Sequence, residues 1–254
     1  MLVLRKPLDD FLGFVFPHTC RICRARLPEA LSGVEGENGG FICASCKKLS
    51  SRLAAPFCSV CNEVLPVENP EQSRVVGAGF SCPSCLKPTS MPVFALGFFD
   101  RHNRELIHRL KYYGDEPAGK FLGGELAKLI TGFHSSPTWD AIVPVPLHWT
   151  RKWSRGFNQS LILAKAVSKS TGISVLLALR RVVRTKDQTR LSREERPANV
   201  HGAFRAVRDV LEKKLLLLDD VTTTGATLEE CRRVLTEAGA AQVSAAVVAL
   251  AQDN

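Results

Sequence analysis

One stretch decides the fold of this chain: residues 215–227, which read LLLLDDVTTTGAT. Its four leucines form a continuous apolar run, which is typical of a central parallel strand buried on both faces. Two adjacent carboxylates, Asp219 and Asp220, follow the run, and ligands bind just outside the carboxyl ends of such strands. A turn rich in threonine and glycine then leads into a helix. Its backbone N–H groups suit a phosphate, because the helix dipole favours an anion at that end.

The residues after this turn complete a strand–helix–strand unit. Apolar residues recur every three or four positions over 227–238, which predicts a helix that stops at Gly239. A strand rich in valine and alanine is expected over 242–251. The turn is neither a Walker A loop nor a G-x-G-x-x-G turn. The plainer alternative is a helix cap, but a cap needs one such residue, not two acids, four threonines and a glycine.

Residues 219–227 resemble the phosphoribosyl-pyrophosphate signature of type I phosphoribosyltransferases, and the whole chain resembles the ComF family of competence- and gluconate-utilisation-associated proteins. The resemblance implies that Asp219 and Asp220 hold the 2′- and 3′-hydroxyls of a ribose. It also implies that the turn cradles the 5′-phosphate with Thr222, Thr223, Thr224, Gly225, Ala226 and Thr227. Purine-salvage members carry a third Asp where this chain has Thr223, which argues against a hypoxanthine-type enzyme.

Two basic segments supply the remaining candidate residues. Arg151 and the run Arg155-Gly156-Phe157-Asn158 resemble the R-x-x-x-R-G-F-N signature of the ComF family. In the superfamily the loop at this place contacts the pyrophosphate, and the planar fork of arginine suits phosphate oxygens. The polar segment 184–196 resembles the mobile catalytic loop that excludes water from the activated sugar. Lys186 and Arg190 are its candidates for charge stabilisation, although a surface loop without a role is the plainer alternative.

Eight of the nine cysteines form four C-x-x-C pairs: Cys20/Cys23, Cys43/Cys46, Cys58/Cys61 and Cys82/Cys85. Nineteen residues separate the first pair from the second, and twenty separate the third from the fourth. This spacing predicts two structural zinc sites, because tetrahedral Zn²⁺ binds four thiolates. Four disulfides are the rival interpretation. The pairs can combine in sequence or as a cross-brace, and resemblance to the double zinc ribbon of ComF N-termini favours the sequential arrangement.

The chain is expected to divide near residue 90. Residues 1–90 hold all four cysteine pairs and no long periodic helix, which predicts a double zinc ribbon that depends on metal for folding. Residues 91–254 alternate strands with helices, which predicts a doubly wound, mostly parallel α/β sheet, and the family resemblance implies that this sheet is of the type I phosphoribosyltransferase kind. Strands are expected over 93–99, 141–145, 176–183 and 200–207, and helices over 104–113, 119–133 and 158–171.

Charge and hydropathy limit the kinds of binding partner and the cellular location that we expect for this protein. The formal net charge is +9, and residues 147–214 carry sixteen Lys and Arg against five Asp and Glu. A basic region beside a carboxylate-lined site suits a pyrophosphate or a nucleic-acid backbone, while a solvated basic surface is the plain alternative. No apolar run is long enough to span a bilayer, and the first residues do not form a secretory signal. We therefore expect a cytoplasmic protein.

These observations predict a ComF-like protein that binds phosphoribosyl pyrophosphate with Mg²⁺ and transfers the phosphoribosyl group, in the context of DNA uptake. The sequence does not identify the acceptor, and the substrate itself would supply most Mg²⁺ ligands. The alternative is a non-catalytic accessory protein that binds single-stranded DNA or DNA-uptake proteins, with Trp149, Trp153 and Phe157 available for stacking. A Lys-Tyr-Tyr run at residues 111–113 resembles one in the family but is left out of the catalytic set.

Overall fold

The centre of the molecule is a four-stranded parallel sheet with strand order β1-β6-β5-β2. The structure is a computed structural model that describes residues 19–27, 42–50, 91, 93–131, 138–147, 156–183 and 195–251. The four strands are β1 (Val93–Phe98), β2 (Ala141–Pro144), β5 (Lys214–Thr222) and β6 (Gln242–Leu250). The prediction of a parallel α/β sheet is therefore confirmed.

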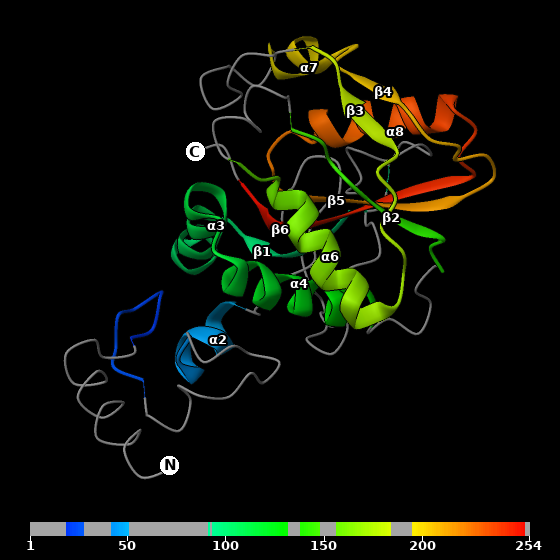
Figure 1. Ribbon diagram of the computed structural model, residues 1–254. Helices are drawn as coiled ribbons and strands as arrows, with labels where there is room; N and C mark the ends of the chain where they lie inside the picture. Colours follow the sequence, from blue (N-terminus) through cyan, green and yellow to red (C-terminus); the bar gives the residue numbers. More distant parts are fainter. Residues whose placement is uncertain are drawn as a thin grey trace, which may run out of the picture.

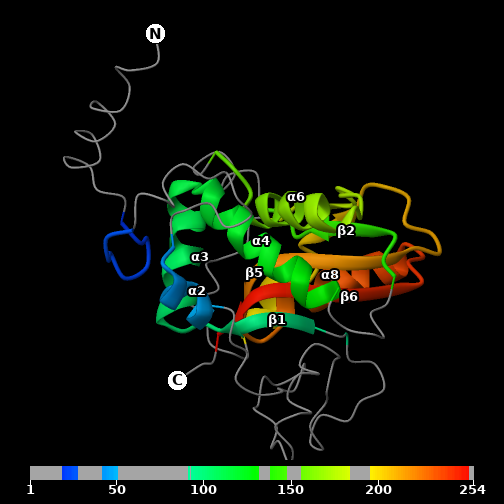
Figure 2. The same cartoon turned by 90° about the horizontal axis from the view of Figure 1, so that it is seen from below.

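Helices cover both faces of this sheet (Figures 1 and 2). One face carries α3 (Arg101–Tyr113), α4 (Glu116–Thr131) and α6 (Gln159–Thr171). The other face carries α8 (Ala226–Glu237) and a small antiparallel pair of strands, β3 (Leu179–Arg181) and β4 (Phe204–Ala206). Two short helices, α2 (Ala44–Ser50) and α7 (Glu195–Val200), lie beside α3 and α8 respectively.

The four leucines of β5 show why the strand has no polar position. Leu216 and Leu218 belong to the buried cluster formed with α3, α4 and α6, whereas Leu215 and Leu217 belong to the cluster formed with α8. Successive side chains of a strand point to opposite faces, and both faces of this sheet are covered. An unbroken apolar run is the consequence.

β5 is longer than the sequence predicts. The last β2–β5 pair joins Pro144 to Leu218, but β5 stays paired with β6 as far as Thr222 and Leu250. Val145 donates one further hydrogen bond to the carbonyl of Leu218, and Pro146, which has no N–H group, cannot extend this pairing. Among the described residues, no strand therefore pairs with the carboxyl end of β5 on its β2 side beyond Leu218, and we call this the open end of β5. Since α6 packs on one face of the sheet and α8 on the other, this end of β5 is where an open α/β sheet places its ligand.

The strands predicted over 176–183 and 200–207 are wrong in extent, although Leu176 donates a hydrogen bond to the carbonyl of Ile142 in the main sheet. β3 and β4 span three residues each and pair with one another, outside the main sheet. Helix α7 ends at Val200, where the second strand was expected to begin. Val182 and Val183 are 40% and 48% exposed, so the apolar run that suggested a buried strand is not buried at its end.

Two helices begin earlier than the apolar periodicity suggests. Asp100 caps α3 by accepting hydrogen bonds from the backbone N–H groups of His102 and Asn103, both at 2.9 Å. α4 begins at Glu116, and Pro117 occupies its first turn, where a missing N–H costs no hydrogen bond. Capping and first-turn residues, not the apolar face, decide these boundaries.

The first cysteine residues share the core of the sheet domain. Cys20, Leu27, Ile42 and Cys46 belong to the same buried cluster as α3 and α4. The guanidinium of Arg21, between the first two cysteines, donates to the carboxylate of Asp115 in the turn between these helices. The proposed division near residue 90 stays a prediction. Among the helices that the structure describes, none is long and apolar enough to cross a membrane.

Candidate functional site

The acidic pair lies at the open end of β5. Asp219 is half-buried and Asp220 is buried. Oδ1 of Asp219 accepts hydrogen bonds from the hydroxyl of Ser160 at 2.8 Å and from the backbone N–H of Asp220 at 2.9 Å. Oδ1 of Asp220 accepts from the N–H of Val221 at 2.8 Å, and its Oδ2 lies 3.8 Å from the ammonium of Lys111. Both carboxylates are thus held in fixed orientations.

Burial and like charge act together on this pair. Burial, followed by the charge of Asp220, raises the pKa of Asp219 to about 7, while the hydrogen bonds from Ser160 and Asp220 and the charge of Lys111 act in the opposite direction. Hydrogen bonds from hydroxyl groups, or a nearby cation, stabilise the ionised form of a carboxylate that is costly to ionise. The pair is therefore suited to a polyhydroxylated ligand accompanied by a metal ion.

The turn after β5 is shaped by Gly225. This residue has φ 75°, in the left-handed region, and is the N-cap of α8 without any side-chain capping hydrogen bond. A Cβ at this position would meet nothing within 4 Å, so the backbone conformation, not crowding, requires glycine. The N–H of Ala226 reaches the hydroxyl of Thr224 only at 3.5 Å. The threonine-rich turn is therefore not an ordinary side-chain cap, and it connects the acidic pair on β5 to the start of α8.

The Gly-Phe-Asn part of the basic motif has a structural role at the start of a helix. Asn158 caps α6 by accepting from the N–H of Ser160 at 3.1 Å, and its amide donates to the carbonyl of Val145 at 3.1 Å. The ring of Phe157 packs against Gly114, where an added Cβ would lie 2.8 Å from the ring. These contacts seat the first turn of α6 so that Ser160 meets Asp219.

Sequence reasoning missed two residues of this site, Ser160 and Gln159, and left a third, Lys111, out of the catalytic set. Ser160 and Gln159 directly follow the Arg-Gly-Phe-Asn run, which is the one sequence signal that points toward them. The buried Gln159 side chain donates to the carbonyl of Lys111 at 3.3 Å. Lys111 stands in the Lys-Tyr-Tyr run left out of the catalytic set, because nothing in the sequence brings α3 to the end of β5.

The other charged candidates lie outside the described residues. They are Arg151, Arg155, Lys186 and Arg190, and the same holds for Trp149 and Trp153. Their assignment to a pyrophosphate-binding loop, a catalytic loop and a stacking surface stays a prediction.

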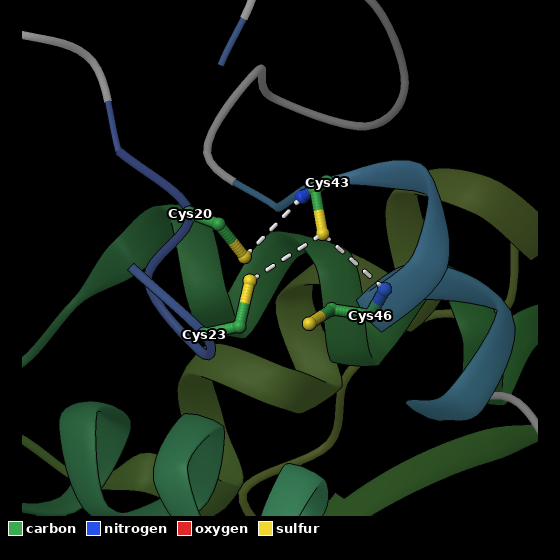
Figure 3. A group of neighbouring side chains, drawn as sticks. All are labelled: Cys20, Cys23, Cys43 and Cys46. Carbon is green, nitrogen blue, oxygen red and sulfur yellow. Dashed lines mark hydrogen bonds between the residues drawn. The ribbon is translucent and has the colours of Figure 1, made fainter. Parts of the chain in front are cut away.

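A second site is formed by the first two C-x-x-C pairs (Figure 3). The Sγ atoms of Cys20, Cys23, Cys43 and Cys46 all lie within 4.8 Å of one another. Those of Cys23 and Cys43 are 3.7 Å apart, too far for a disulfide, and none of the four cysteines forms a disulfide. Backbone N–H groups of Cys43 and Cys46 point at the sulfurs of Cys20 and Cys43, at 3.3 and 3.4 Å.

This geometry fits a tetrahedral metal ion. Four thiolates about 2.3 Å from one Zn²⁺ are about 3.8 Å from each other, close to the spacing observed. Burial raises the pKa of Cys20, but N–H groups of Cys43, Cys23 and Ile22 outweigh it and lower the pKa to about 6. The first pair combines with the second, which is the sequential arrangement. The remaining cysteines, Cys58, Cys61, Cys82 and Cys85, lie outside the described residues.

The fold and the acidic pair define a class of protein with a phosphoribosyltransferase-type domain. Residues 158–254 match the family model described as "Phosphoribosyl transferase domain". The chain is 28% identical to competence protein F of Haemophilus influenzae, covering 90% of this chain and 95% of that protein. It is 31% identical to the DNA utilization protein YhgH of Escherichia coli K12 (89% and 94%) and 24% identical to competence protein ComFC of Bacillus subtilis (80% and 81%).

These similarities extend over both the cysteine pairs and the sheet. The chain belongs to the ComF family, the group that includes competence protein F and YhgH. The family resemblance drawn from the acidic pair and the cysteine spacing is therefore confirmed.

Proposed function

We propose that this protein binds phosphoribosyl pyrophosphate with Mg²⁺ at the end of β5 and transfers the phosphoribosyl group to an acceptor. The observation that carries the proposal is the pair Asp219 and Asp220, oriented at the open end of a buried strand and bordered by a glycine-capped helix start. The carboxylates accept the ribose hydroxyls, and N–H groups of the turn and α8 bind the 5′-phosphate. In the displacement of pyrophosphate, Arg151, Arg155, Lys186 and Arg190 stabilise the leaving charge.

Calorimetric titration with phosphoribosyl pyrophosphate and Mg²⁺ tests this proposal. An Asp219→Asn/Asp220→Asn variant keeps the side-chain volume but loses both charges. Two hydrogen bonds to charged groups contribute about 1.5–3 kcal/mol each, so we expect binding to weaken by at least a hundredfold, roughly. The control is Asp209→Asn/Glu212→Gln, the same charge change on exposed residues before the opposite end of β5. Absence of binding to the unaltered protein would contradict the proposal.

A second candidate function is binding of single-stranded DNA, in line with the names of the competence and DNA-utilization relatives. The observation in its favour is the exposed face of α3. Arg101, Arg104 and His108 are exposed, Tyr112 and Tyr113 are 58% and 71% exposed, and the rings of His108 and Tyr112 lie 4.5 Å apart. Aromatic rings beside cations suit stacked bases and phosphates.

Salt dependence separates the two functions. Anisotropy of a labelled single-stranded oligonucleotide should rise on binding, and its affinity should fall steeply with salt. A Tyr112→Ala/Tyr113→Ala variant should weaken oligonucleotide binding without changing the titration with phosphoribosyl pyrophosphate. Oligonucleotide affinity that does not change in this variant would remove α3 as the binding face.

A further inference from the structure

Lys111 reaches the acidic pair from a distant part of the chain. It lies in the last turn of α3, with its Nζ atom 3.8 Å from Oδ2 of Asp220. The Asp220 side chain is 11% exposed and that of Lys111 is 32% exposed, so the pair is partly shielded from water. Charges in such a position are screened less than a surface pair.

The end of α3 is held at this place by α6. The carbonyl of Lys111 accepts a hydrogen bond from the buried amide of Gln159 at 3.3 Å. The helix ends at Gly114, which has φ 60° and packs against the ring of Phe157. The residues that seat Ser160 on Asp219 therefore also set the position of Lys111. Because the carbonyl and not the side chain makes the α6 contact, substitution of Lys111 leaves this packing in place.

The groups around Asp219 come from four elements. Asp220 on β5 adds a like charge, Ser160 on α6 donates a hydrogen bond, and Lys111 on α3 adds the opposite charge. On α8, the buried thiol of Cys231 has a pKa raised well above its usual value, so it stays neutral. Lys111 thus adds a positive charge that acts, together with the hydrogen bonds from Ser160 and the N–H of Asp220, against the repulsion between the two carboxylates.

We propose that Lys111 is a positioning residue of this site, whose ammonium favours ionisation of Asp219 beside Asp220 so that both side chains accept the hydroxyls of a bound ribose. The inference rests on the proposed function for the identity of the ligand. It assigns to Lys111 an effect on the charge of the carboxylates, not a contact with the phosphates.

Titration with phosphoribosyl pyrophosphate and Mg²⁺ between pH 6 and 9 tests this role. Lys111→Met should raise, by about one unit, the pH below which the affinity for phosphoribosyl pyrophosphate falls. Affinity should then be about five- to tenfold lower than that of the unaltered protein at pH 7 and equal to it by pH 9. Lys111→Arg should keep the normal profile. Lys120→Met, which removes an exposed cation paired with Glu116 at 3.9 Å, is the control. A loss of equal size at pH 7 and pH 9 would overturn the role.

A measurement without ligand separates this inference from the proposed function. Asp219 has a raised pKa in the folded protein, so its ionisation costs stability as the pH rises from about 4 through 7. Removal of Lys111 increases that cost, and the deficit in Tm of Lys111→Met relative to Lys120→Met should grow between pH 5 and pH 8. If the unaltered protein does not bind phosphoribosyl pyrophosphate, the pH dependence of this difference in Tm is the test of the role of Lys111. A deficit that does not change with pH overturns the inference.

Discussion

The carboxylate of Asp219 is costly to ionise in the folded protein, and the same carboxylate is proposed to bind the ribose. This carboxylate lies beside Asp220 and under partial burial, which together raise its pKa to about 7. The hydrogen bonds from Ser160 and from the N–H of Asp220 orient it but do not remove the cost. Charged groups held in costly arrangements are typical of functional sites. The residue therefore gives a prediction about stability that needs no substrate.

Asp219→Asn should stabilise the protein at high pH. The amide keeps the shape and the acceptor oxygen of the carboxylate but carries no charge. The pKa of Asp219 is raised in the folded protein, so ionisation of this residue lowers the free energy of unfolding. This loss is absent below about pH 4 and complete above about pH 7. We therefore expect Asp219→Asn to raise the free energy of unfolding by about 1–3 kcal/mol at pH 8 and by almost nothing at pH 4. Denaturant unfolding at both pH values measures it, with the exposed Asp209→Asn as control. Equal effects at both pH values would contradict an origin in the ionisation of Asp219.

At the scale of elements, the corner between α3 and α4 meets the start of α6. Gly114 ends α3 in the left-handed region, and the ring of Phe157 occupies the space where a side chain would begin. Asp115 follows at once, caps α4 through the N–H of Ala118 and receives the guanidinium of Arg21. One turn thus joins the acidic-pair site to the cysteine cluster.

Gly114→Ala should lower the free energy of unfolding by more than backbone strain alone explains. Gly172, which ends α6 with φ 78° and nothing within 4 Å of an added Cβ, is the matched control for strain alone. We expect Gly172→Ala to cost about 1–2 kcal/mol. Gly114→Ala should cost about 1–3 kcal/mol more because the ring of Phe157 must move. Thermal unfolding compares the two variants. Equal losses would show that the close packing contributes little.

At the scale of the whole molecule, metal bound by the cysteine cluster should stabilise the sheet domain as well as the cysteine segment. Cys20 and Cys46 are buried in the same cluster as α3, α4 and the strands, so loss of the cluster's geometry exposes a shared core. A structural zinc site contributes directly to folding free energy. The assignment to zinc, the second four-cysteine site and the cytoplasmic location stay predictions.

Removal of the metal should lower the Tm of the entire chain. A Cys20→Ser/Cys23→Ser variant should lose one metal ion per chain, measured by release to a chromophoric chelator. Its single unfolding transition should move down by about 2–4 °C for each kcal/mol lost. Cys231→Ala, which removes a buried thiol from α8, should keep the full metal content. A separate, early transition that leaves the main one unmoved would mean that the cysteine segment unfolds independently.

Local patterns in the sequence predicted what depends on near neighbours. The leucine run, the acidic pair and the glycine at the turn predicted a βαβ unit, because strand burial and helix starts are decided within a few residues. The spacing of the cysteine pairs predicted four-thiolate sites but left their pairing open, and the family resemblance favoured the combination of the first two pairs that the structure shows. The strands expected over 176–183 and 200–207 were predicted too long, because β3 and β4 pair with each other outside the main sheet.

Only the tertiary structure decided which distant groups meet. Ser160 lies 59 residues from Asp219 in sequence, and Arg21 lies 94 residues from Asp115. Lys111 joins the acidic pair because α6 holds the end of α3 beside the open end of β5. A sequence states which side chains can hydrogen-bond or form ion pairs, but packing of α3, α6 and β5 determines the distances between them, and electrostatic interactions depend on those distances.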